Sequence, residues 1–99
     1  MYFGHEKLTV YSLALDIARW AQGVATRRTL KDQLVRAADS VVLNIAEGAA
    51  REGDARKNHY RIALGSAAEV AAVMDLLGTS GTQASDIRRV GAMLAKLTR

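Results

Sequence analysis

Two glutamates, two serines and an asparagine are the residues of this 99-residue chain whose types and spacing could do chemistry. Ser40, Asn44 and Glu47 follow one another at steps of four and three, which places them on one stripe of a helix. Ser66 and Glu69 repeat the step of three further along. Three interpretations are open: a hydrogen-bonded network that sets helix register, a ligand or catalytic site, or a surface stripe used for docking.

The sequence argues against metal or catalytic chemistry at these residues. A di-iron helical bundle needs Glu-x-x-His pairs, and neither His5 nor His59 has a glutamate three residues before it. Cysteine is absent, so thiolate zinc sites and disulfides are not available. There is no glycine-rich phosphate loop and no serine in a nucleophile elbow. We therefore expect no catalytic residue, no metal, no cofactor and no enzymatic activity.

The elements that position these residues are helices, because apolar residues recur at steps of three and four. Valine and isoleucine are scattered rather than alternating, so strands are not expected. The expected helices cover about 7–25, 29–50, 54–77 and a short segment from 85 onward. Short connections favour antiparallel neighbours. The prediction is an all-α, antiparallel up-down-up-down four-helix bundle that forms a single domain over residues 1–99.

Three polar residues mark the expected helix starts. Thr29 opens the capping-box sequence TLKD, Asp54 is the expected N-cap of the third helix, and Ser85 can start the fourth. Glu69 lies in line with Ile62 and Val73 at the spacing of a packing seam.

We expect the seams of the second and third helices to face each other, because both combine polar and apolar residues at packing positions. A buried carboxylate needs donors or a cation, since leaving it bare costs several kcal/mol. Candidate cation partners are Arg36, Arg51 and Arg61. We expect Asn44 and Glu69 to be largely buried and hydrogen-bonded, and to hold the fold rather than perform chemistry. The seam residues that share this hydrogen-bonded network are Ser40, Asn44, Glu47, Ser66 and Glu69.

Two stretches, QLVRAADSVVLNIAEGAAR at 33–51 and HYRIALGSAAEV at 59–70, resemble a known family. These are small four-helix-bundle proteins first recognised as encoded by intervening sequences in bacterial 23S rRNA genes. The motif positions are Gln33, Arg36, Ala37, Ser40, Asn44, Ile45, Ala46, Glu47, Gly48, Arg51, Gly65, Ser66 and Glu69. The resemblance implies a four-helix bundle that forms ring-shaped homo-pentamers. The chain is also similar to the accessory variability proteins of diversity-generating retroelements, which bind nucleic acid and a reverse transcriptase.

A formal net charge of +4 permits nucleic-acid contact. In an up-down bundle the basic residues gather at both ends. The candidate nucleic-acid contacts are Arg51, Arg56 and Lys57 at one end and Arg27 and Arg28 at the other. Aromatic residues make up 5% of the chain, too few for base stacking to be the expected mode. We expect contact with RNA or DNA phosphates without sequence preference.

An alternative makes the assembly itself the function. Leu8, Leu15 and Leu43 are apolar residues that one core face does not account for. They favour a ring-shaped homo-oligomer that docks a protein partner and has no nucleic-acid role. No run approaches the length of a membrane span, and the opening residues lack a signal-peptide pattern, so a cytoplasmic protein is the expectation.

Overall fold

The computed structural model describes residues 3–99. A short 3-10 helix, η1 (Gly4–Lys7), precedes four α-helices. These are α1 (Thr9–Gln22), α2 (Arg28–Ala49), α3 (Gly53–Leu77) and α4 (Thr82–Leu97). No strand occurs in this part of the chain. The all-α prediction is confirmed, with helix ends displaced by up to three residues. None of the described helices is long and apolar enough to cross a membrane.

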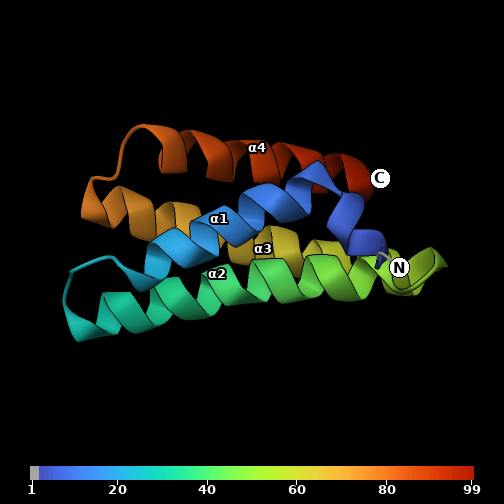
Figure 1. The fold of residues 1–99 in the computed structure, drawn as a ribbon, viewed down its shortest axis with the longest axis horizontal. Coiled ribbons are helices and arrows are strands. Elements are labelled where there is room, and N and C mark those ends of the chain that lie inside the picture. Colours follow the sequence, from blue (N-terminus) through green and yellow to red (C-terminus); the bar gives the residue numbers. More distant parts are fainter. Residues whose placement is uncertain (1–2) are drawn as a thin grey trace.

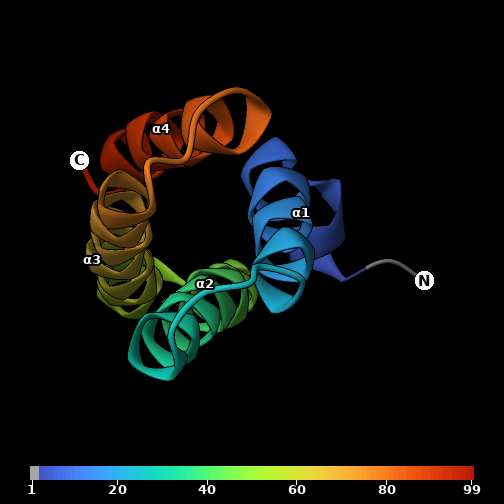
Figure 2. The same ribbon diagram turned by 90° about the vertical axis from the view of Figure 1, so that its left-hand side faces the viewer.

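Successive helices point in opposite directions. In Figure 1 the colour runs from right to left along α1 and from left to right along α2, and α3 and α4 repeat that alternation. Viewed along the bundle, the four helices follow one another around a shared core (Figure 2). Each helix contacts its two neighbours in this ring, and α4 closes it by packing on α1. The helices α2 and α4 therefore occupy diagonally opposite corners.

The expected N-caps are wrong, because other residues start these helices. Thr29, Asp54 and Ser85 all lie inside the first turn or just beyond it, and the N-cap residues make no side-chain cap bond. Lys31 instead ties the start of α2 to the end of α1, donating from Nζ to the carbonyl oxygens of Gln22 and Val24. The start of α4 moves forward to Thr82 because Gly81, at φ 83°, turns the chain there.

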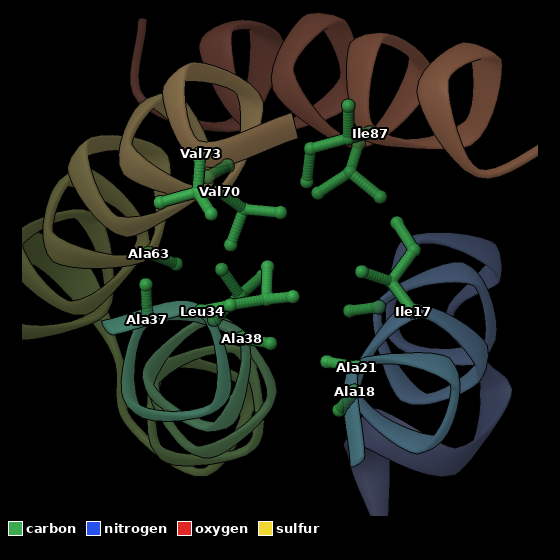
Figure 3. Packing of buried hydrophobic residues seen from close by; sticks show 14 of the residues in the cluster. Ile17, Ala18, Ala21, Leu34, Ala37, Ala38, Ala63, Val70, Val73 and Ile87 are labelled. Carbon is green, nitrogen blue, oxygen red and sulfur yellow. The ribbon is translucent and has the colours of Figure 1, made fainter. Parts of the chain in front are cut away.

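The core is built from small and branched side chains on the inner faces of the helices. Figure 3 shows Ile17 of α1, Leu34 of α2, Val70 of α3 and Ile87 of α4 converging on the bundle axis. Alanines occupy the places where neighbouring helices approach each other, and the labelled ones are Ala18, Ala21, Ala37, Ala38 and Ala63. Because protein cores are close-packed, this core should tolerate added side-chain volume poorly.

Helices α2 and α3 approach each other closely at Gly48. A Cβ added to Gly48 would lie 2.6 Å from Cε1 of the buried Tyr60 ring and 3.3 Å from the carbonyl oxygen of Arg56. Real Cβ atoms essentially never come that close to another heavy atom, so only glycine leaves enough space here for the Tyr60 ring. The contact fixes α3 against the last turn of α2.

Candidate functional site

A small hydrogen-bond network joins α2 to α3. Ser40 Oγ and Ser66 Oγ lie 2.8 Å apart and link the two helices directly. Asn44 Nδ2 donates to the carbonyl oxygen of Ser40 at 2.9 Å and to its Oγ at 3.2 Å. Asn44 Oδ1 lies 3.1 Å from His59 Nδ1. Because an amide oxygen only accepts, His59 carries its proton on Nδ1 and donates it to Asn44.

These four side chains are half-buried, so the network lies at the edge of the α2–α3 contact rather than in the core. No buried side-chain nitrogen or oxygen within residues 3–99 lacks a hydrogen-bond partner. A satisfied polar network of this kind fixes how two helices pair. In the same part of the chain, no group of three or more histidine and acidic side chains is placed to hold a metal ion.

Sequence reasoning did not place His59 in this network. His59 lies seven residues before Ser66, two turns of α3, and therefore on the same side of the helix. The seven-residue spacing between His59 and Ser66 is the sequence signal that indicates a position on the same side of the helix. In the sequence alone, His59 stands out only as a histidine that lacks the glutamate a metal site would need.

Glu47 is outside the network. Its Oε2 accepts from Arg51 at 3.2 Å to Nη2 and 3.3 Å to Nε, one turn along α2. The two side chains are 52% and 55% exposed, so they form a surface pair of small energetic weight.

Glu69 is exposed on α3, and the expectation that it is buried is wrong for a single chain. The buried stripe of α3 runs through Tyr60, Ala63, Ala67, Val70 and Met74. Ser66 borders this stripe on the α2 side. Three residues turn a helix by about 300°, so Glu69 is rotated roughly 60° further from the core than Ser66. Glu69 thus faces outward from the bundle.

The three basic residues near the α2–α3 corner are not equivalent. Arg56 Nε donates to the carbonyl oxygen of Gly48 at 3.1 Å, and Nη2 donates to that of Ala49 at 3.3 Å. These are among the last carbonyls of α2, so Arg56 caps a helix C-terminus. Arg51 is held by Glu47. Lys57 is half-buried and forms no ion pair with any described side chain.

The two candidate arginines at the opposite end are far more accessible. Arg27 is the N-cap residue of α2, and Arg28 is its first residue; both are exposed. Arg28 Nε lies 4.0 Å from Asp32 Oδ2, a loose contact between side chains that are 95% and 60% exposed. Arg27 and Arg28 lie beside the unbonded N–H groups of the first turn of α2, which is the positive end of the helix dipole. Helix α4 starts at this same end (Figure 1).

The structure therefore separates the four candidate arginines into two groups. Arg51 and Arg56 are engaged within the chain, at a helix C-terminus. Arg27 and Arg28 extend into solvent at a helix N-terminus, the end that attracts anions. The α1–α2 end is accordingly the end whose candidate arginines are the more accessible to solvent.

Comparison with known proteins gives one family. The family model of the 23S rRNA-intervening sequence protein matches residues 6–97. The matched segment contains α1, α2, α3 and α4 in full, the α2–α3 network and the basic residues at both ends. No curated protein and no solved structure matches the chain.

Proposed function

The chain belongs to the 23S rRNA-intervening sequence protein family, and from that premise we propose that it is a non-enzymatic, homo-oligomeric nucleic-acid-binding protein. The protein folds as an antiparallel up-down-up-down bundle. It is located in the cytoplasm and binds the phosphates of RNA or DNA. The relation to the accessory variability proteins of diversity-generating retroelements is part of this proposal.

The observation that carries the nucleic-acid proposal is the start of α2. Arg27 and Arg28 are exposed there beside the free N–H groups of the first turn. Guanidinium groups and a helix N-terminus both attract phosphate, and here the two occur together at the start of α2. A ring of copies would repeat this surface once in every subunit.

Exposed apolar side chains support the homo-oligomer. Leu43 is 64% exposed and Leu76 is 69% exposed, and Phe3 and Ile62 are exposed as well. Phe3 and Leu43 border the same hollow, and an exposed apolar patch of this kind is typical of an interaction surface. A pentamer is the expected assembly.

Binding by this surface should be electrostatic and indifferent to base identity. Each neutralised phosphate releases counterions, so log affinity should fall linearly with log salt, by roughly 0.9 per phosphate on duplex DNA and about 0.7 on a single strand. The chain has one tryptophan, one phenylalanine and three tyrosines, and Tyr60 is buried in the core. Base stacking is therefore a small part of the proposed mode.

The test is a filter-binding titration with structured RNA, single-stranded RNA and duplex DNA at low salt. The parent should bind all three, and Arg28→Glu, alone or combined with Arg27→Glu, should weaken all three by a similar factor. Arg61→Glu is the matched control for Arg28→Glu, because Arg61 is exposed on α3 away from both ends and the charge change is the same. Retention of none of the three ligands at tens of micromolar protein would refute nucleic-acid binding.

The second candidate function is a scaffold whose ring-shaped oligomer docks a protein partner without binding nucleic acid. The exposed side chains of Leu43, Ile62 and Leu76 support it, because they offer apolar surface that a phosphate ligand would not cover. An oligomer that binds none of the three nucleic acids would favour this function.

A further inference from the structure

Helix α2 carries an exposed row in which a leucine stands between two acidic residues. Asp39, Leu43 and Glu47 are four residues apart, so they form one ridge on the outer side of the helix, and all three are exposed. Shallow apolar hollows flank Leu43 on both sides, one bordered by Leu15 and the other by Phe3. The leucine side chain therefore projects from the surface of the chain.

Helix α4 carries a row of the same spacing and opposite charge. Arg88, Ala92 and Lys96 are four residues apart and exposed. Arg88 and Ala92 border an apolar groove between α3 and α4 with a volume of about 270 Å³. The rest of its wall is formed by small and aliphatic residues, which are Leu64, Ala67, Ala68, Ala71, Ile87 and Gly91. Where α2 presents a leucine between two acids, α4 presents an alanine between two bases, with the groove beside that alanine.

We propose that the acidic ridge of α2 in one copy of the chain packs on the basic ridge of α4 in a second copy. Leu43 enters the α3–α4 groove of that copy, beside Ala92. The occupant of the groove is a second copy because the two rows match in spacing, in size and in charge. This inference rests on the proposed homo-oligomer and names the surface that forms it.

The matching holds in either relative direction of the two helices. Each step of four residues advances about 6 Å along a helix, so both flanking charges of one row reach the flanking charges of the other. Rows of this kind pack into each other at a crossing angle of about −50°. To make the new contact, Glu47 must give up its ion pair with Arg51. That pair is half-exposed, so its loss costs little.

The position of the two rows decides what kind of assembly forms. Helices α2 and α4 lie at diagonally opposite corners of the bundle (Figure 2). The hollows beside Leu43 are lined by α2, α1 and the N-terminal segment, and the groove is lined by α3 and α4, so one copy carries the leucine and the groove on separate surfaces. A copy that gives its leucine to one neighbour still offers its groove to another. Such a contact is heterologous, and it produces a closed ring or an open filament rather than a two-fold dimer.

Three arginine substitutions test the contact by light scattering at micromolar concentration. Leu43→Arg brings a cation against Arg88 and Lys96, and Ala92→Arg fills the groove; each should reduce the assembly to the 10.7 kDa monomer. Ser12→Arg introduces the same residue at an exposed position of α1 and should leave the parent mass unchanged. Circular dichroism of each variant verifies that the helices remain.

Mixing the two disrupted variants gives the decisive measurement. Leu43→Arg keeps an intact groove and Ala92→Arg keeps an intact leucine, so an equimolar mixture should form a species of twice the monomer mass and nothing larger. A mixture that stays monomeric overturns the heterologous contact. So does a Leu43→Arg variant that keeps the parent mass, or an assembly that is broken by Leu76→Arg instead. A parent that is itself monomeric overturns the proposed homo-oligomer as well, and this is seen before any variant is made.

Discussion

The two ends of the bundle carry similar numbers of arginines and use them in different ways. At the α2–α3 corner, Arg56 donates to the last carbonyls of α2. At the α1–α2 end, Lys31 does the same for the end of α1, while Arg27 and Arg28 at the start of α2 remain exposed. At these two places, Arg56 and Lys31 bind the carbonyls at the end of a helix, and Arg27 and Arg28 stay accessible at the start of one. The reason is electrostatic, because a helix C-terminus presents free carbonyls and a helix N-terminus presents free N–H groups.

This difference teaches that formal charge alone does not locate a phosphate-binding surface. Arg56 and Arg28 contribute the same charge to the chain, yet one satisfies backbone acceptors and the other is available to a ligand. The corner should therefore respond to substitution with a loss of stability. The α1–α2 end should respond with a loss of binding.

The largest effect is expected from Gly48→Ala at the corner. The new methyl would lie 2.6 Å from the Tyr60 ring, and Tyr60 is buried and cannot swing into solvent. Overpacking costs about 1–3 kcal/mol and occasionally more, and a contact this far below van der Waals distance belongs at the upper end of that range. About 2 kcal/mol of destabilisation should therefore remain after the roughly 1 kcal/mol by which alanine favours a helix over glycine. Urea denaturation followed by circular dichroism measures the difference. Gly65→Ala is the control, because a Cβ there meets nothing within 4 Å and should leave the stability equal or raise it. An equal effect of both substitutions would contradict the close contact.

A somewhat smaller effect is expected from Asn44→Ala. This change removes the bonds to Ser40 and His59 in a half-buried place, and stranding such partners costs about 1–2 kcal/mol. Glu69→Ala should change the monomer's unfolding free energy by less than about 0.5 kcal/mol, because Glu69 is exposed. Thermal melts at a concentration where the chain is monomeric compare the two. If Glu69→Ala lowers the free energy of unfolding more than Asn44→Ala does, the Glu69 carboxylate is buried, as the sequence predicted.

The sequence predicted the helices and the family well because both depend on local patterns. Apolar steps of three and four placed every helix within three residues of its ends, and the motifs at 33–51 and 59–70 carried a family resemblance that the family match confirms. The caps were not predictable from local signals, because the start of α2 is set by Lys31 reaching back to α1. That contact depends on the tertiary fold.

The candidate site was predictable only in part. The spacing of Ser40, Asn44 and Ser66 identified residues that the structure brings together. Glu69 was misplaced because alanines lie on both the buried and the exposed side of α3, so the two sides are hard to tell apart in sequence. Ala67 is buried and Ala68 is exposed. The role of Arg56 depends on carbonyls eight and seven residues earlier in the chain, which no charge pattern reveals.

A third prediction sets Arg56 against its neighbour at the corner. Arg56→Ala should lower the free energy of unfolding by about 1 kcal/mol, because the carbonyls of Gly48 and Ala49 lose a charged donor. Lys57→Ala should be close to neutral, since Lys57 makes no ion pair with a described residue. Chemical denaturation of both variants decides the matter. Equal stabilities would mean that Arg56 is not a cap and is as available to phosphate as Lys57.

The smallest effect, and the most specific to function, is expected from Arg28→Glu. The side chain is 95% exposed and its contact with Asp32 is loose, so the unfolding free energy should change by less than about 0.5 kcal/mol. Single-stranded RNA affinity should fall, and the slope of log affinity against log salt should become shallower by about 0.7 for each phosphate that the protein no longer neutralises. Anisotropy titrations at four or more salt concentrations give that slope, with Arg61→Glu as the charge-matched control. If Arg61→Glu reduces the slope as much as Arg28→Glu does, binding follows net charge, and the start of α2 has no special part in it.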